Sequence, residues 1–472
     1  MTGSGTGRWW ALAALTGANV LVFASVTIMN VALPDLRTDL SLSAGAARWV
    51  VTLYSLVFGM LILLGGRLGD VLGLRSCLVA GLVGFSAASV LGGLATNAEL
   101  LLLARGLQGG AGALVAATAV SLMSVAFPTG RERALAFAVL GIVMGVGTPG
   151  SLLLGGLLVD LLSWRWCLLV NVPLALLAAV GVRLFAPPGD RRPGSRVDVA
   201  GAVLAVLGLA AVAGGLDRAT AWGWSDARTL GLLLGGAAGL TAFALALRRA
   251  THPLVPPYLL RRRTRSLGYV AAFFVGVAMF AGMFVLTVFL QVALARSPTE
   301  IGIAFAPFML GAVGITWTLP ALRATFTPGS VLALGLTAAG GAVLTLALLS
   351  ARSTYVTGVL PAMVLLGVGG TIVMVTAADL ATADAGEDSG VAGSMVNSAQ
   401  QVGAGLGTAL LTSVMTTTTH AELTRGAEPL AAAIAGYARS GMVGGTIVIL
   451  AACLVWAMCA RPGPGAAARP GA

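Results

Sequence analysis

The charged residues of this sequence leave fourteen long stretches that contain no Asp, Glu, Lys or Arg. Each stretch has at least seventeen residues, enough for a helix to cross a hydrocarbon core of about 30 Å. They cover residues 9–34, 49–66, 76–98, 106–130, 134–159, 166–182, 199–216, 229–247, 266–295, 301–322, 324–351, 353–378, 389–421 and 440–460. Barrel strands would be about 10 residues of strict alternation, and nothing here alternates. The pattern predicts an all-α, polytopic membrane protein with fourteen transmembrane helices.

The composition excludes most other classes. Only 10% of the residues are charged and 58% are hydrophobic, whereas a soluble domain carries roughly 25% charged residues and a disordered chain has the opposite balance. The loops leave no room for a soluble catalytic domain, and no phosphate loop or metal-ligand spacing is present. We therefore expect no enzymatic activity, no cofactor and no bound metal.

The net charge of +11 has a topological explanation. All 28 basic residues are arginines, and a cytoplasmic N-terminus puts eighteen on the cytoplasmic side, nine outside, and Arg105 near or inside a span. This bias follows the positive-inside rule. It predicts a multi-pass protein of the plasma membrane with both termini cytoplasmic, and it argues against nucleic acid as a partner.

Two hydrophilic segments rich in Pro and Arg divide the chain, at residues 186–197 and 248–265. They predict a six-helix bundle in residues 1–185, a connector with two more transmembrane helices in 186–266, and a second six-helix bundle with a short cytoplasmic tail in 267–472. Transporters often consist of duplicated bundles with the substrate site between the halves. A 6+2+6 division fits this plan.

Arg105 is the most informative polar residue. An arginine at the centre of a membrane helix costs about 2.5–3.5 kcal/mol and usually faces a cavity or a partner. Arg105 lies six residues after Glu99, so it either points into the protein or reaches the outer interface. Gln108 follows one turn later and would share its face.

Several motifs resemble a known family. Gly66-x-Leu68-x-Asp70-x-x-Gly73-x-Arg75 is similar to the strongest motif of the major facilitator superfamily, and Arg105-x-x-Gln108-Gly109 resembles that superfamily's fourth-span motif. Further segments resemble its fourteen-span drug:proton antiporter branch, the EmrB/QacA type: residues 27–34, 49–54, 163–166, 171–173, 252–256, 290–291, 297–302 and 397–401. The resemblance implies the major facilitator fold.

The resemblance also implies gating residues. Asp70 and Arg75, in a loop with Gly66 and Gly73, would stabilise the outward-facing state; the alternative is a solvated turn. Exposed ion pairs are worth about 0–1 kcal/mol, which suits a latch that opens in every cycle. In span five, Pro149, Gly155 and Gly156 correspond to a gating motif, but Ser151-Leu152 replace the family's Gly-Pro before the two glycines.

A second departure concerns coupling. The family usually has an aspartate in span one where this chain has Ser25. Burial raises the pKa of a membrane carboxyl group toward working pH, which makes it a natural proton carrier. Without it, Asn19, Asn30 and Gln108 remain as neutral partners for Arg105, and Asp379 and Glu99 are the fallback carboxylates.

Two spans carry candidate substrate contacts. Span nine contains Phe280, Met283, Phe284 and Gln291; Met and Phe make adaptable apolar surfaces, although the same residues would also suit a lipid-facing helix. The resemblance implies that this span lines the cavity. In span thirteen, Asn397 and Gln401 have helical spacing, and interhelical hydrogen bonding is their alternative role.

Taken with the resemblance, the sequence predicts a secondary active transporter. It would export amphipathic small molecules, drugs or antibiotics, by alternating access and proton antiport, and it would work as a monomer in the lipid bilayer. The alternatives are a facilitator or differently coupled carrier of a metabolite, and a membrane receptor that does not transport.

Overall fold

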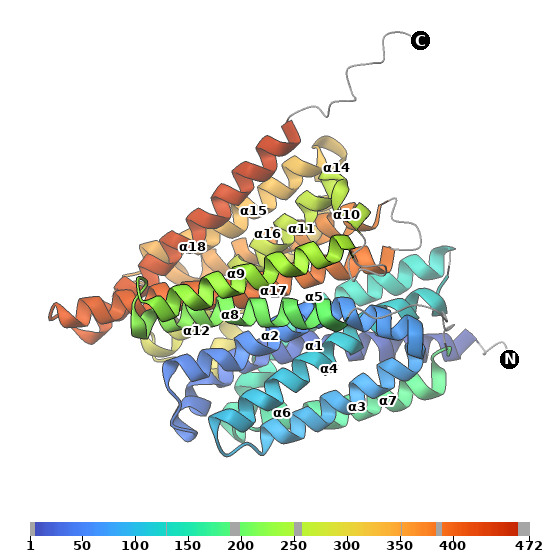
Figure 1. The fold of residues 1–472 in the computed structure, drawn as a ribbon, viewed down its shortest axis with the longest axis horizontal. Coiled ribbons are helices and arrows are strands. Elements are labelled where there is room, and N and C mark those ends of the chain that lie inside the picture. The colour runs from blue at the N-terminus through green and yellow to red at the C-terminus, as the bar shows by residue number, and fades with distance from the viewer. Residues whose placement is uncertain are drawn as a thin grey trace, which may run out of the picture.

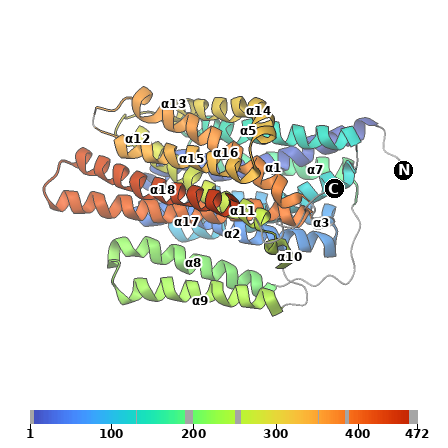
Figure 2. The ribbon, with the colours of Figure 1, turned by 90° about the horizontal axis from the view of Figure 1, so that it is seen from above.

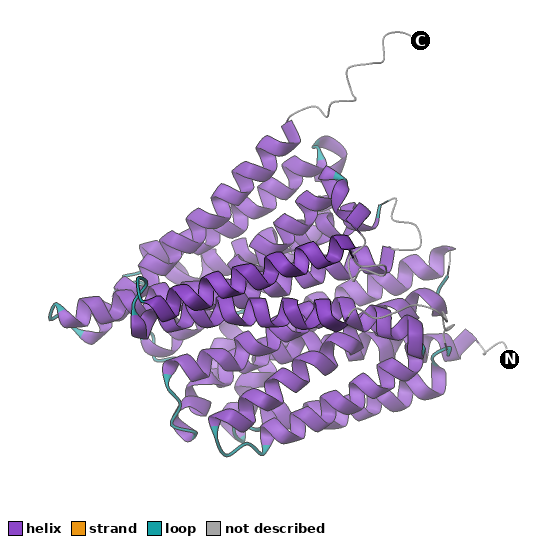
Figure 3. Ribbon diagram, viewed as in Figure 1, coloured by secondary structure: helices purple, strands orange, loops and turns teal. Residues whose placement is uncertain are grey.

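The computed structural model of the protein describes residues 5–128, 130–188, 199–249, 257–350, 352–383 and 389–460. These residues are 90% helical, and no strand occurs among them (Figure 3). The predicted all-α class is confirmed. Lipid cannot satisfy backbone N–H and C=O groups, so a chain this apolar bonds them within helices.

The first part of the chain forms an N-terminal group of helices. Its members are α1 (Gly5–Asp39), α2 (Ala44–Leu72), α3 (Leu74–Gly93), α4 (Ala98–Ala126), α5 (Gly130–Leu161), α6 (Trp166–Leu169) and α7 (Asn171–Phe185). Side chains cap two of the starts: Ser43 accepts a bond from Ala46 N at α2, and Asn97 accepts one from Leu100 N at α4. Gly73 both ends α2 and precedes α3, and its φ of 98° favours glycine.

Two helices form an accessory pair, α8 (Val199–Trp222) and α9 (Ala227–Arg249). They lie side by side at one edge of the molecule (Figures 1 and 2). Helix α8 packs on both α2 and α17, while α9 packs on α8. Trp49 of α2 donates from Nε1 to Oδ2 of Asp217 in α8 at 3.2 Å. The pair therefore covers the place where α2 and α17 meet.

The remaining elements form a C-terminal group. They are α10 (Pro257–Arg261), α11 (Arg263–Gly276), the π-helical turn η1 (Val277–Ala281), α12 (Gly282–Val292), α13 (Pro298–Ala304), α14 (Ala306–Thr325), α15 (Pro328–Leu344), the short turns η2 (Thr345–Leu348) and η3 (Tyr355–Val359), α16 (Leu360–Thr382), α17 (Ser389–Thr424) and α18 (Pro429–Ala460). In Figure 1 these helices slope away from the N-terminal group toward the side where α1 begins and α18 ends.

In the described part of the chain, eleven helices are long and apolar enough to cross a membrane. The other three expected stretches lie in α2, α5 and α17, which are 29, 32 and 36 residues long. The apolar runs found in α2 and α5 are shorter, Trp49–Ile62 and Gly150–Leu161, and α17 carries many Ser, Thr, Asn and Gln side chains. A total of fourteen spans stays a prediction.

Helix crossings in this protein depend on glycine. In lipid, helices associate through close packing because the surrounding tails are as apolar as leucine. A Cβ added at Gly109 of α4 would lie 2.7 Å from the carbonyl oxygen of Tyr54 in α2, and one at Gly367 of α16 would overlap the carbonyl of Phe308 in α14. These backbones touch because the glycines have no side chain.

We predict that Gly367→Ala destabilises the protein, because the added methyl group must push α16 and α14 apart. We expect a loss of about 1–3 kcal/mol, as for other overpacked sites, measured as a lower midpoint of thermal unfolding in detergent. Gly341→Ala in α15 is the matched control, since nothing lies within 4 Å of its added Cβ. Equal midpoints for the two variants would contradict the packing argument.

Candidate functional site

Arg105 lies inside the protein. Its side chain is fully buried in α4, seven residues after the helix begins at Ala98 and so about 10 Å along its axis. Of the two placements that the sequence allowed, the structure has the interior one. A buried guanidinium requires hydrogen-bond partners for all its donors.

The partners of Arg105 are all neutral. Its Nε donates to the carbonyl of Val50 in α2 at 2.9 Å, its Nη2 to the carbonyl of Ser25 in α1 at 3.3 Å, and its Nη1 to Oε1 of Gln108. The guanidinium carbon also lies 4.2 Å from the centre of the Tyr54 ring, a cation–π contact. One side chain thus joins α1, α2 and α4.

The network continues through Gln108. Its Nε2 donates to Oγ of Ser89 in α3 at 2.8 Å, and that hydroxyl donates to the carbonyl of Phe85 at 2.7 Å. The expected pairing of Gln108 with Arg105 is therefore present in the structure. No carboxylate is among the described contacts of Arg105.

Neither of the two asparagines proposed as partners forms a described hydrogen bond with Arg105. Asn19 donates to the carbonyl of Leu15 in its own helix at 3.0 Å. The Oδ1 atom of Asn30 is buried and has no hydrogen-bond partner among the described residues. Their place near Arg105 is taken by backbone carbonyls, because the guanidinium reaches the exposed lone pairs of helices α1 and α2.

Tyr54 is a site residue that the sequence reading missed. Its hydroxyl donates to the carbonyl of Val22 in α1 at 2.8 Å, and its ring carries the cation–π contact. A Cβ at Gly112 would lie 2.9 Å from this hydroxyl. The glycines after Arg105 were the available signal, since they leave room for a large side chain from a neighbouring helix.

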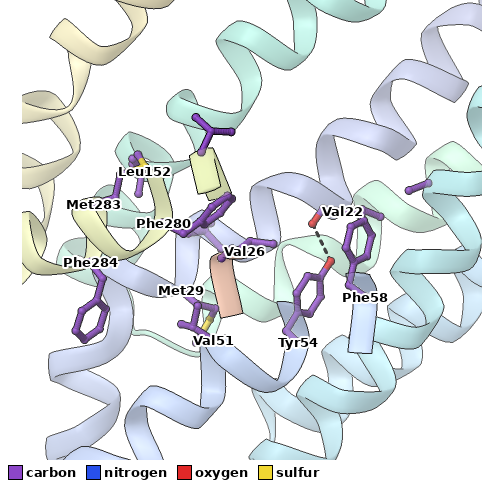
Figure 4. Close-up of a cluster of buried hydrophobic side chains, with 14 of the residues drawn as sticks. Val22, Val26, Met29, Val51, Tyr54, Phe58, Leu152, Phe280, Met283 and Phe284 are labelled. Carbon is purple, nitrogen blue, oxygen red and sulfur yellow. Dashed lines mark hydrogen bonds between the residues drawn. The ribbon is translucent and has the colours of Figure 1, made fainter. Parts of the chain in front are cut away.

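An apolar cluster lies where the two groups of helices meet (Figure 4). Phe280 and Met283 of the C-terminal group lie close to Val26 and Met29 of α1 and to Leu152 of α5. Phe280, Met283 and Phe284 are all more than nine-tenths buried. Of the two alternatives for these residues, the structure has them inside the protein and away from a lipid-facing surface.

The expected continuous helix over residues 266–295 is interrupted. Residues Val277–Ala281 form a π-helical turn between α11 and α12, and Phe280 belongs to it. Such turns are frequent at functional sites and redirect the side chains that follow. Apolar periodicity cannot reveal one, because a single extra residue in a turn leaves the composition unchanged.

Polar residues of α17 and α12 also lie at this boundary. Ser398 donates from Oγ to the carbonyl of Gly59 in α2, and Gln401, fully buried, packs next to that glycine. Gln291 donates from Nε2 to the carbonyl of Val31 in α1 at a long 3.4 Å. Asn397 is half-buried.

Glycines on both helices bring α5 and α13 into close contact. This contact lies at the end of the molecule opposite the start of α1 and the end of α18 (Figure 2). A Cβ at Gly156 would overlap the carbonyl of Pro298, and one at Gly302 would lie 2.6 Å from the Cα of Leu153. Oδ2 of Asp160 accepts a hydrogen bond from the backbone N–H of Thr299 at 2.9 Å. These contacts join the two groups of helices at this end.

The other gating residues expected in α5 are Pro149 and Gly155. A Cβ at Gly155 would lie 2.7 Å from Cγ1 of Ile28, so this glycine packs α5 on α1. Position 149 lies within α5, but the Pro149 side chain is outside what the structure describes. Ser151 shares a hydrogen bond of 2.5 Å with Oγ1 of Thr27.

The segment expected to be a loop is helical except at Gly73: Asp70 lies in α2 and Arg75 in the first turn of α3. Arg75 binds the end of another helix. Its Nη1 donates to the carbonyl of Ala186 at 3.3 Å and its backbone N–H to that of Pro188 at 3.4 Å, just after α7. The Asp70 side chain lies outside the described residues, and the space around Gly66 is open. A bond between Asp70 and Arg75 stays a prediction.

The fallback carboxylates both lie at exposed helix positions. Glu99 is exposed in the first turn of α4, and Asp379 forms an exposed ion pair with Arg323. Within the described ranges, no three His, Cys, Asp or Glu side chains gather as metal ligands would. The buried polar groups that contact Arg105 are therefore neutral, while two other charged side chains, Arg265 of α11 and Asp217 of α8, are also buried in the described part of the chain.

A helical membrane protein with a buried cation and an apolar boundary between two groups of helices has the architecture of a transporter. The Major Facilitator Superfamily profile matches residues 15–408. The chain belongs to the Major Facilitator Superfamily, whose members are transporters of small molecules and not enzymes.

Similar proteins extend over nearly the whole chain. The puromycin resistance protein of Streptomyces alboniger is 40% identical over 461 residues, which is 96% of this chain and 91% of that protein. The cephamycin export protein of Amycolatopsis lactamdurans is 34% identical over 86% of this chain and 84% of its own length. The lincomycin resistance protein of Streptomyces lincolnensis is 32% identical, covering 86% of this chain and 84% of that protein.

A solved structure supports the fold. An auto-inhibited peptide transporter of the POT family superimposes with a TM-score of 0.65, covering 98% of this chain and 99% of its own. Its sequence identity is 18%. The major facilitator fold is thereby confirmed.

We predict that Gly156→Ala opens the contact between α5 and α13, because its methyl group overlaps the Pro298 carbonyl. Spin labels at exposed positions 161 and 303, in a background without the four native cysteines, would report the distance between these helices. We expect the variant to shift the distribution toward longer distances. Gly150→Ala in the same helix, with nothing within 4 Å of its Cβ, should leave it unchanged; equal distributions would contradict the role of Gly156.

Proposed function

We propose that the protein is an exporter of amphipathic small molecules such as antibiotics, from the fourteen-span drug:proton antiporter branch of its family. The observation that carries this proposal is the similarity to resistance and export proteins over nearly the full chain. The motifs of the EmrB/QacA type support the branch.

The proposed mechanism is alternating access between residues 1–185 and 267–472, with two additional membrane helices in 186–266. In the structure, the two groups meet through α5 and α13 at one end and diverge toward the other in Figure 1. If both termini are cytoplasmic, as the arginine distribution predicts, this is an inward-facing state. Opening would separate Gly156 from Pro298 and Gly302 from Leu153.

Arg105 has the central role in this proposal. Because it joins α1, α2 and α4 through neutral acceptors, a small displacement of any of these helices changes its bonds. Substrate would contact Phe280, Met283 and Phe284, with Gln291, Asn397, Gln401, Ser25 and Asn30 as polar neighbours. These assignments rest on burial at the boundary between the two groups of helices and on the family motifs.

We propose that export is driven by the proton gradient through antiport. The protein would work as a monomer in the plasma membrane. One observation favours a second candidate, a facilitator or differently coupled carrier: Ser25 stands where the family has an aspartate, and only its carbonyl contacts Arg105. A receptor that does not transport would bind substrate without flux.

Everted membrane vesicles with an imposed pH gradient, acidic inside, separate these candidates. We expect uphill accumulation of a fluorescent amphipath, and we expect an uncoupler to abolish it. A facilitator would equilibrate the compound with or without the uncoupler. Vesicles that lack the protein are the control, and accumulation that survives collapse of the gradient would contradict proton coupling.

We predict that Arg105→Lys lowers the export rate at least about tenfold. Lysine keeps the charge, but its compact ammonium cannot reach the acceptors on α1 and α2 at the same time. It also cannot stack on the Tyr54 ring as a planar guanidinium does. One lost hydrogen bond to a charged group is worth about 1.5–3 kcal/mol, and about 1.4 kcal/mol corresponds to tenfold. Initial rates in proteoliposomes, at matched protein density, provide the measurement.

The matched control for this variant is Arg425→Lys. Arg425 is exposed and pairs with Glu422 three residues before it, where an ion pair contributes little. Its export rate should stay near that of the unmodified protein. Near-normal export by the Arg105→Lys protein would refute the proposed role.

A further inference from the structure

Three neutral polar side chains near the boundary between the two groups of helices have buried polar atoms without hydrogen-bond partners. They are the hydroxyl of Ser25, the Oδ1 atom of Asn30, and both amide atoms of Gln401. Ser25 and Gln401 are 0% exposed and Asn30 is 3% exposed. A buried group left without a hydrogen bond has lost its hydration without compensation, so each of them would gain from a ligand that supplies one.

Their placement connects them with the apolar cluster of Figure 4. Asn30 follows Val26 by one helical turn and shares its face, and Val26 lies beside Phe280 in that figure. Ser25 likewise precedes Met29 by one turn. Gln401 of α17 packs next to Gly59 of α2, so it lies between the two groups of helices.

The buried charge next to Ser25 is positive. The guanidinium of Arg105 is fully buried, and its Nη2 lies 3.3 Å from the carbonyl of Ser25. The whole chain has seventeen Asp and Glu residues. Among the described ones, Asp35 of α1, Asp160 and Glu300 are exposed, and the buried Asp217 binds Trp49 of α2.

An organic cation at this boundary would meet a like charge. Burying an ion without an opposite charge is far more costly than burying a neutral group with hydrogen bonds. An uncharged molecule could instead pair its donors and acceptors with the free groups of Gln401, Asn30 and Ser25. Its apolar part would pack on Phe280 and Met283.

We propose that the cargo of this transporter is an uncharged amphipath that carries hydrogen-bonding groups, and that lipophilic cations are rejected. The inference rests on the proposed export function and adds the substrate class to it. Gln401 is the specificity-determining residue, because its amide offers both a donor and an acceptor.

A matched series of probes tests the charge preference. Dansylcadaverine carries an ammonium group, its N-acetyl derivative is neutral, and its N-succinyl derivative is an anion on the same fluorophore. In proteoliposomes, we expect initial export of the neutral compound to exceed that of either charged compound at least about tenfold, since 1.4 kcal/mol corresponds to tenfold. Equal rates for the cation and the neutral compound, or a preference for the anion, would overturn the proposal.

Isosteric variants test the residue. Gln401→Glu places a carboxylate at the boundary, and we expect it to raise the export of the ammonium compound relative to the neutral one about tenfold. Asn30→Asp, the same chemical change on α1, serves if the first variant does not fold. Asn97→Asp adds a carboxylate at the capped start of α4 and should leave the ratio unchanged. An unchanged ratio in both boundary variants would overturn the role of these side chains.

Binding separates failure of this inference from failure of the proposed function. If none of the three compounds is exported, the export proposal fails. The charge preference of binding can still be measured, as the rise in the unfolding midpoint of the detergent-solubilised protein when each compound is added. We then expect only the neutral compound to raise the unfolding midpoint. Stabilisation by the ammonium compound that equals or exceeds it would overturn the inference.

Discussion

Close contact between helix backbones is the constraint on which the rest of this structure depends. Lipid provides little hydrophobic force between helices, so their association requires the short distances that glycine permits. Gly109 brings α4 against α2, and Gly367 brings α16 against α14. The same device joins the two groups of helices at Gly156 and Gly302. The glycines that hold each group together thus resemble the ones that would separate in the proposed alternating-access mechanism.

The buried arginine follows from this packing. Because α1, α2 and α4 approach closely, carbonyls of Ser25 and Val50 come within reach of one guanidinium, and the ring of Tyr54 covers it. Neutral acceptors distribute the positive charge without cancelling it. For this reason we propose that the boundary beside it favours uncharged ligands, whereas a carboxylate at position 25 would favour cations. In this proposal, the presence of Ser25 where the family usually has an aspartate affects both proton coupling and substrate specificity.

Much of the fold could be predicted from the sequence, and less of the site. The charge-free stretches gave the helical class because lipid leaves no alternative, and the motif around Arg105 drew attention to Arg105 and Gln108. Tyr54, Asp160 and the π-helical turn at Phe280 were not predicted as site features. The contacts of Tyr54 and Asp160 depend on how one helix is rotated against another, which residue type along a single helix does not encode. The π-helical turn is a local change of hydrogen bonding that leaves the apolar composition unchanged. Asn19 was expected at Arg105 and instead bonds its own helix.

The sequence by itself determined that the chain is an all-helical membrane protein of the Major Facilitator Superfamily, because apolar length and motif spacing are properties of the chain alone. The tertiary structure decided which polar groups meet. It placed Arg105 inside among carbonyls, left Gln401 and Asn30 without partners, and brought Gly156 onto Pro298. These outcomes depend on contacts between residues far apart in sequence, and such contacts exist only after the helices have packed.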